Sequence, residues 1–238
     1  MRESMVSLVV EGTMKVANML RAGAKSLRRK LRLSPMHKVF RRLSRYGVDP
    51  RTFNALEVFG GGGQSHTKDI ASVVPRLEIW EILPQMESVL KRTFPQSEIK
   101  ITDSYVEIQR VPKKYDLVVV DNSSTAFDHY EHFDLFPIIF RVLNDSAVVI
   151  LNVIPRVRTK HPERLKRRQA FYSATDPTNI SFREMADTYR IVAEQNGWTM
   201  EQFFCERRWI LSLGQDTAYY GVLKLKRQDG PKAQRTCE

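Results

Sequence analysis

The chain has 238 residues and a net charge of +11, and 42% of its residues are hydrophobic. This size and composition suit one large domain with an appendage and exclude a wholly disordered chain. Two cysteines exclude a disulfide framework and fit a reducing compartment. Because no apolar run approaches the length of a membrane-spanning helix, we expect a cytoplasmic protein.

The positive charge is concentrated in two segments. Residues 1–50 carry 12 Lys and Arg against 3 acidic residues, and residues 156–170 carry 7 against 1. Residues 51–155, between them, carry 10 against 14. The excess charge therefore belongs to attachments and not to the central part of the chain.

Residues 1–50 are predicted to form a basic helical N-terminal extension. An amphipathic helix is expected over residues 4–33, and a second, shorter basic helix over residues 36–46. Three roles are open: capping a sheet, lying on an anionic membrane surface, and binding RNA phosphates. The apolar stripe of the first helix favours the first two, since it has to be buried. A peripheral membrane location is therefore kept beside the cytoplasmic one.

From residue 53 onward, strands alternate with helices. Helices are expected over residues 66–74, 85–93, 132–143 and 181–196, the last with a capping box of Ser181 and Glu184. Strands are expected over residues 55–59, 77–82, 98–102, 115–120, 147–153, 199–206 and 219–226. The last two strands lack an intervening helix, so one of them is expected to be antiparallel. The pattern predicts an α/β fold with a doubly wound, mostly parallel seven-stranded sheet in residues 51–230, followed by a flexible tail, 231–238.

Acidic residues stand at the ends of the first four strands. Ligands of such sheets bind at the carboxyl ends of the strands, where these side chains would share one edge. A run of four glycines, residues 60–63, follows the first strand, and glycine lets the backbone approach a ligand closely. The acids are Glu57, Glu81, Asp103 and Asp121.

The stretch 53–153 resembles the class I S-adenosylmethionine-dependent methyltransferases, a Rossmann-like family. The segment "EVFGGGG" is similar to the family's first motif at Glu57, Gly61 and Gly63, whereas Phe59 stands where the first glycine usually falls. The resemblance implies S-adenosylmethionine as cofactor, with Glu57, Gly61 and Gly63 close to it.

The other three acids match later motifs of the same family. The resemblance implies that Glu81 binds the ribose hydroxyls and that Asp103 lies near the adenine. It also implies that Asp121 faces the methionine end and the acceptor. Carboxylates suit these tasks because they accept hydrogen bonds from hydroxyl and amino groups.

The segment after the fourth strand bears on the reaction. "DNSS" is not the D/N-P-P-aromatic tetrad of the family's amino-methylating nucleic-acid enzymes, which favours O-methylation of a small or anionic acceptor. The spacing is similar to metal-dependent O-methyltransferases, but Leu151 replaces an acid beside Asn152, so no metal site is expected. Asp121 and His129 are the candidate catalytic residues, and His132 is a further candidate base.

Residues 156–168 follow the fifth strand, close to the expected acceptor. This basic segment could clamp an anionic acceptor, such as a phosphorylated, lipid-linked or nucleic-acid molecule, or form a solvated helix face. Three alternative functions stay open. They are an RNA-binding or RNA-modifying methyltransferase-like protein, an aminopropyltransferase-like enzyme, and a non-catalytic relative of the fold. The oligomeric state is also left open.

Overall fold

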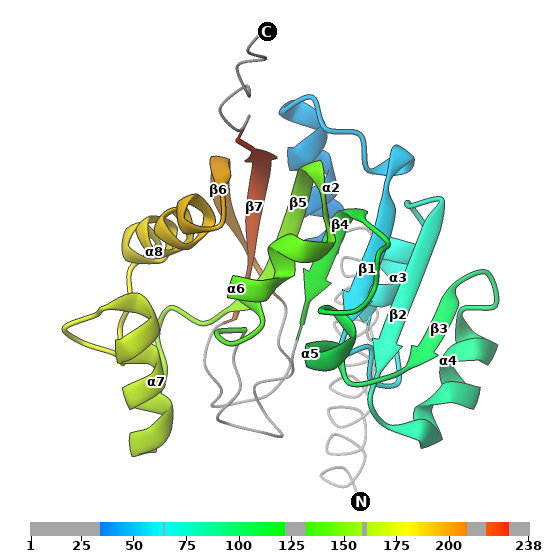
Figure 1. Ribbon diagram of the computed structural model, residues 1–238, viewed down its shortest axis with the longest axis horizontal. Helices are drawn as coiled ribbons and strands as arrows, with labels where there is room; N and C mark the ends of the chain where they lie inside the picture. Colours follow the sequence, from blue (N-terminus) through cyan, green and yellow to red (C-terminus); the bar gives the residue numbers. More distant parts are fainter. Residues whose placement is uncertain (1–33, 64, 122–131, 159–160, 209–217, 229–238) are drawn as a thin grey trace, which may run out of the picture. The chain divides into compact units, whose positions relative to one another are not determined.

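The computed structural model describes residues 34–63, 65–121, 132–158, 161–208 and 218–228. These residues form a seven-stranded sheet with helices on both faces (Figure 1). The expected helix over residues 4–33 and the tail 231–238 lie outside the described residues. The domain boundaries therefore stay predictions.

The strands follow the predicted positions closely. The strands are β1 (Asn54–Val58), β2 (Arg76–Glu81), β3 (Glu98–Ile101), β4 (Tyr115–Val120), β5 (Leu143–Val153), β6 (Trp198–Arg207) and β7 (Tyr219–Arg227). The α-helices are α2 (Pro35–Arg45), α3 (Ser65–Ala71), α4 (Glu87–Thr93), α5 (Ser104–Glu107), α6 (Phe136–Ile139), α7 (Pro162–Tyr172) and α8 (Phe182–Gln195). Short 3-10 turns cover Pro50–Thr52, Pro84–Met86 and Phe140–Val142.

The strand order is β3-β2-β1-β4-β5-β7-β6. In this spatial order, β3, β2, β1, β4 and β5 pair in parallel. The strand β7 is antiparallel to both of its neighbours, β5 and β6. The predicted mostly parallel seven-stranded sheet is confirmed, as is the single antiparallel strand near its end. Because the parallel strands share one direction, their carboxyl ends meet at one edge.

Each face of the sheet buries its own core. Leu117 and Val119 of β4 belong to the cluster that packs with α2, α3 and α4. Val118 and Val120 point the other way, toward α6 and α8. This alternation is the two-residue period of a strand covered on both faces, and it explains the continuous apolar run of β4.

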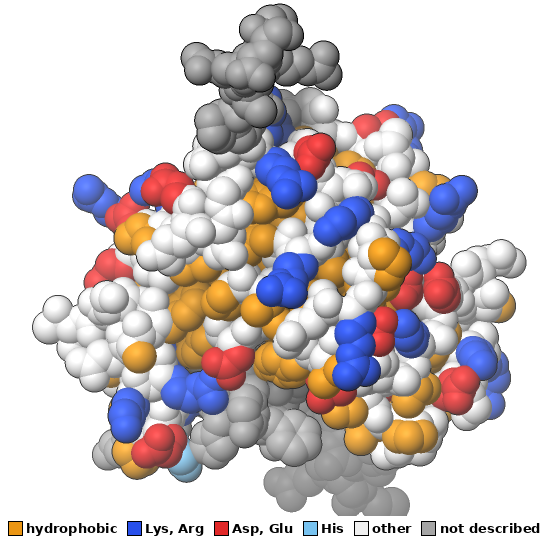
Figure 2. Space-filling view, viewed as in Figure 1, with side chains coloured by type: hydrophobic (Ala, Val, Ile, Leu, Met, Phe, Trp, Pro, Cys, Tyr) orange, Lys and Arg blue, Asp and Glu red, His pale blue; other side chains and the backbone are white. Residues whose placement is uncertain are grey.

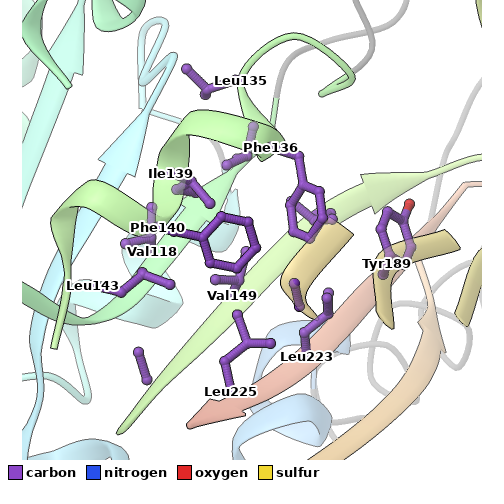
Figure 3. Packing of buried hydrophobic residues seen from close by; sticks show 14 of the residues in the cluster. Val118, Leu135, Phe136, Ile139, Phe140, Leu143, Val149, Tyr189, Leu223 and Leu225 are labelled. Atoms are coloured by element: carbon purple, nitrogen blue, oxygen red, sulfur yellow. The ribbon is translucent and has the colours of Figure 1, made fainter. Parts of the chain in front are cut away.

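Aromatic rings fill much of the core on the α6 side (Figure 3). The ring of Phe136 lies 5.4 Å from that of Phe140 and 5.1 Å from that of Tyr189, between centroids. Both contacts have the edge-on geometry that aromatic pairs favour. The rings thereby join α6 to α8, which begins with the predicted capping box of Ser181 and Glu184.

The predicted helix over residues 132–143 is wrong in length. Only Phe136–Ile139 is α-helical, a 3-10 turn follows, and β5 already begins at Leu143. Pro137 accounts for the late start, since proline is tolerated in the first turn of a helix but not in its interior. The short helix α5 was not predicted, and α7 lies largely within the basic segment 156–168, for which a solvated helix face was one of the two alternatives.

Candidate functional site

The glycine run forms a tight turn at the carboxyl end of β1. Gly60 continues the pairing with β2, because its N–H donates to the Trp80 carbonyl at 3.0 Å. A Cβ on Gly60 would lie 2.3 Å from Cγ2 of Ile79, so no larger residue fits without movement. Gly61 and Gly63 have φ of 54° and 81°, the left-handed region that glycine enters without steric cost.

Phe59, the departure from the motif, also has a left-handed backbone, with φ of 65°. The turn therefore demands this conformation at the position where glycine is expected, and a bulky residue adopts it at a cost. The side chain is half-buried against the core, with its ring 6.0 Å from that of Tyr105. The phenyl group thus packs toward α5.

Glu81, the last residue of β2, holds the turn in place. Its Oε2 accepts a hydrogen bond from the Gly61 N–H at 2.6 Å, and its Oε1 accepts one from the Leu83 N–H at 2.9 Å. The side chain is only 5% exposed. Each carboxylate oxygen can accept a second hydrogen bond, so Glu81 retains acceptor capacity for a ligand beside the glycine turn.

Asp103 stands apart from the other three acids. It is exposed and caps α5, accepting a hydrogen bond from the Tyr105 N–H at 2.8 Å. Large apolar side chains are exposed on either side of this region, with Ile82 at 57%, Leu83 at 43% and Val106 at 39%. An exposed apolar rim next to acceptor oxygens suits a flat, heteroaromatic ligand.

Glu57 and Asp121 are brought together by His66, the second residue of α3. Nε2 of His66 lies 2.9 Å from Oε1 of Glu57, and Nδ1 lies 3.1 Å from Oδ2 of Asp121. Thr67 Oγ1 donates to the same Glu57 oxygen at 2.8 Å. All four side chains are buried, so two carboxylates share one imidazole away from water.

A second cation reaches Asp121 from the far end of the chain. Nη1 of Arg208, just after β6, lies 2.5 Å from Oδ1 of Asp121, and its guanidinium lies 4.8 Å from the centroid of the Tyr220 ring. Burial opposes the charge on Arg208, but Asp121 and Tyr220 outweigh it and raise the pKa of Arg208. The guanidinium is thus held in place by a carboxylate and an aromatic ring.

Solved structures share this arrangement of strands and helices. M. jannaschii TYW2 in complex with AdoMet aligns at a TM-score of 0.53 and 12% identity, covering 82% of this chain and 78% of that one. A putative RNA methyltransferase from Pyrococcus horikoshii aligns at 0.52 and 9%, covering 82% and 83%. A putative sarcosine dimethylglycine methyltransferase from Galdieria sulphuraria aligns at 0.52 and 12%, covering 82% and 85%. The chain has the class I methyltransferase fold.

The resemblance drawn from the glycine and acid motifs is therefore confirmed for the fold. No protein-family model and no curated protein matches the sequence. The neighbours are named as putative methyltransferases of RNA and of sarcosine and dimethylglycine, so proteins with different acceptors share this fold.

Within this class I fold, the predicted site residues fall into two groups. Gly61 and Glu81 are joined by a hydrogen bond, and Glu57 and Asp121 are joined through His66. Gly63 ends the glycine turn, and Asp103 stands outside both groups, capping α5 instead. The assignment of each residue to a part of the cofactor stays a prediction.

His66, Thr67 and Arg208 belong to the site and were not predicted. His66 and Thr67 begin a helix that was expected, directly after the glycines, so their place in the chain was a usable signal. Arg208 lies 87 residues from Asp121 in sequence, and no local pattern marks it.

The two histidine candidates have different outcomes. His129 lies outside the described residues, so its catalytic role stays a prediction. His132 is fully buried, with Nε2 2.8 Å from the Tyr189 hydroxyl, which in turn lies 2.9 Å from that of Tyr172. Burial lowers the pKa of His132 to about 3, so the ring is neutral near pH 7 and part of the core. His132 does not fit the candidate base.

The basic segment 156–168 is partly structural. Arg168 is fully buried, and its Nε donates to the Pro177 carbonyl at 2.7 Å and its Nη2 to the Ile154 carbonyl at 2.9 Å. Arg164 is also buried, and Arg167 pairs with Asp134. Arg156, Arg158 and Lys166 are exposed. Only part of this positive charge is therefore presented to a partner.

In the part of the chain that the structure describes, no group of three or more His, Cys, Asp or Glu side chains is placed to hold a metal ion. Nor does any described helix have the length and apolar character needed to cross a membrane.

Proposed function

We propose that the chain binds S-adenosylmethionine at the carboxyl edge of β1, β2 and β4 and is a methyltransferase. The observation that carries this proposal is the 2.6 Å hydrogen bond between the Gly61 N–H and Glu81, in a chain with the class I methyltransferase fold. This hydrogen bond holds the glycine turn beside a carboxylate that could bind ribose hydroxyls. Such an arrangement suits a nucleoside ligand.

The described residues fit such a ligand. Gly60 and Gly63 let the turn pack closely on the protein, because a Cβ there would lie 2.3 Å from Ile79 and 2.5 Å from Phe94. Glu81 would hold the ribose hydroxyls, and Asp103 would accept from the base, flanked by the apolar side chains of Ile82 and Leu83. Oε2 of Glu57 is buried and receives no hydrogen bond from the described residues, which suits a cationic amino group or a bound water.

When bound, S-adenosylmethionine supplies an electrophilic methyl group on a sulfonium. The protein has to hold the acceptor in line with that group and to remove a proton from it. Asp121 is poorly suited to removing the proton, because its two oxygens already face Arg208 and His66. His129 is the remaining candidate base from the sequence.

The acceptor that we propose is an oxygen atom of a small or anionic molecule. The lack of the amino-methylating tetrad after Asp121 supports oxygen, and the exposed Arg156, Arg158 and Lys166 support an anion. On the face shown in Figure 2, Lys and Arg side chains are spread among acidic and apolar ones.

RNA is the second candidate acceptor. The exposed basic residues after β5 favour it, and the Pyrococcus horikoshii neighbour is named as a putative RNA methyltransferase. Binding of a single-stranded RNA that weakens steeply with salt, and that is lost on replacing Arg156, Arg158 and Lys166 by glutamine, would favour this candidate over a small acceptor.

Calorimetry with S-adenosylmethionine tests the cofactor proposal. We expect binding by the full chain and its loss in Glu81→Ala, with Glu201→Ala on β6 as a control that keeps the affinity. Absence of binding by the unmodified chain would refute the proposed function.

A further inference from the structure

Four ionisable side chains from four separate elements meet behind the glycine turn. Glu57 comes from β1, His66 from α3, Asp121 from the end of β4 and Arg208 from the end of β6. Glu57 is 0% exposed, His66 2% and Asp121 6%. Two carboxylates at the ends of neighbouring parallel strands are thus held close together with very little water.

The contacts of His66 specify its protonation state. A neutral imidazole has one N–H, so it can donate to only one of the two carboxylates. The other carboxylate would then face a ring-nitrogen lone pair, at 2.9 Å for Glu57 or 3.1 Å for Asp121. Oδ2 of Asp121 receives no hydrogen bond from the described residues, so its 3.1 Å contact with Nδ1 of His66 is an ion pair. Only the doubly protonated ring attracts both carboxylates.

The electrostatics agree with this assignment. Burial disfavours the charged ring and the Arg208 guanidinium repels it, but Asp121 and Glu57 together outweigh both and raise the pKa of His66. With His66 protonated, two cations balance two carboxylates. Loss of its proton would leave a buried cluster with one excess negative charge, which is costly in a region of low dielectric.

The other polar groups around His66 do not replace this cation. The Tyr220 ring lies edge-on, 6.2 Å from the imidazole, and Thr67 donates to Glu57 but carries no charge. Asp69, on the same helix as His66, lies 3.4 Å from His37 of α2.

We propose that His66, as an imidazolium, is a positioning residue that holds Glu57 and Asp121 at adjoining strand ends, and that its deprotonation weakens cofactor binding. The bridge stands on the described contacts, and its effect on the cofactor rests on the proposed function. Deprotonation leaves the two carboxylates mutually repulsive, so they would move away from the positions that the imidazolium imposes.

A ligand-free experiment tests the bridge. In the full chain labelled at the histidine Cε1 carbons, the His66 signal is assigned by its loss in His66→Gln and followed by NMR against pH. We expect a midpoint above the ordinary histidine value of about 6.5. Asp121→Asn should lower the midpoint by at least about one pH unit, whereas Arg208→Met, which removes a repelling cation, should raise it.

The opposite signs of these two shifts keep the test decisive. General loosening of the fold would move both variants toward the ordinary value. A wild-type midpoint at or below the ordinary value, or an unchanged midpoint in both variants, would overturn the bridge. If Asp121→Asn does not fold, Glu57→Gln takes its place with the same expected direction.

Binding of S-adenosylhomocysteine tests the functional half. This probe lacks the positive charge of the sulfonium. Its affinity therefore depends on the arrangement of the site and less on direct attraction between a sulfonium and the carboxylates of Glu57 and Asp121. Calorimetry from pH 6 to pH 8.5 should show that the affinity of the wild type for the probe decreases as the pH is raised. In His66→Gln we expect an affinity that is about tenfold weaker, as is typical of energetic coupling between two sites, and nearly independent of pH. His161→Gln, an exposed histidine, is the matched control.

The two failures can be told apart. If the wild type binds the probe at no pH, the proposed function fails while the NMR titration still decides the bridge. If it binds with the same pH dependence in wild type and His66→Gln, the positioning role is overturned and the proposed function is kept.

Discussion

Gly61 and Glu81 are joined directly, the Gly61 N–H donating to Oε2 of Glu81 at 2.6 Å across 20 residues of sequence. The acid at the end of β2 therefore shapes the glycine turn as well as facing the site. The turn and the carboxylate are one unit, and changing either should alter both the local backbone and the binding of a nucleoside.

Glu81→Gln should weaken S-adenosylmethionine binding by at least about tenfold, nearly as much as Glu81→Ala. The carboxylate accepts from two backbone amides, and an amide side chain would turn its NH2 group toward one of them. Calorimetry measures the affinities, with Glu201→Gln as the control. Near-normal affinity in Glu81→Gln would show that the carboxylate charge is dispensable.

Gly60→Ala should destabilise the fold by about 1–3 kcal/mol, as overpacking of a core does. The added Cβ would meet Cγ2 of Ile79 at 2.3 Å. Gly62→Ala is the matched control, because its nearest neighbour would be Sδ of Met86 at 3.9 Å and its φ is not positive. Urea denaturation compares the two variants, and equal stabilities would contradict the tight approach of the turn to β2.

Phe59→Gly should be more stable than Phe59→Ala by about 1 kcal/mol, the cost of a left-handed backbone for a residue with a Cβ. Both variants lose the ring that packs near Tyr105, so that loss cancels in the comparison. Only glycine relieves the φ of 65°. Denaturant unfolding of the pair measures the difference, and greater stability of the alanine variant would argue against the left-handed conformation.

Arg168→Lys should destabilise the protein by about 2–4 kcal/mol, since a buried fork of donors is replaced by a single ammonium. The carbonyls of Pro177 and Ile154 would lose partners away from water. Lys166→Gln, exposed on the same helix, should change stability by less than about 0.5 kcal/mol. If the two variants unfold alike, Arg168 does not serve as an anchor of α7.

His132 should make the protein sensitive to acid. Its pKa is lowered to about 3 in the fold, while the unfolded chain takes up a proton near pH 6.5. The unfolded state thus binds more protons between these values. As the pH is lowered through this window, the unfolding free energy therefore decreases by about 1 kcal/mol per pH unit. His132→Gln keeps an acceptor for Tyr189 and removes the titration. Its unfolding free energy should fall less steeply from pH 6 to pH 4, and an identical slope would contradict a neutral buried ring.

Much of the fold was predictable because its signals are local. The apolar run of β4, the glycines after β1 and the capping box of α8 each report a short-range preference of the backbone. The predicted helix over residues 132–143 is wrong in length because Pro137 is tolerated only in the first turn of a helix. For the segment that contains α7, the sequence favoured either an anion clamp or a solvated helix face, whereas Arg168 is in fact buried among carbonyls.

For the site, local signals are enough to place glycines and acids at the carboxyl ends of parallel strands, since strand direction brings consecutive ends to one edge. Which groups touch depends on tertiary packing: Glu81 with Gly61, His66 between Glu57 and Asp121, and Arg208 on Asp121. The position of β7 between β5 and β6 and the reach of Arg208 across 87 residues arise from non-local pairing. Such contacts depend on how the whole chain packs, and no short stretch of sequence encodes them.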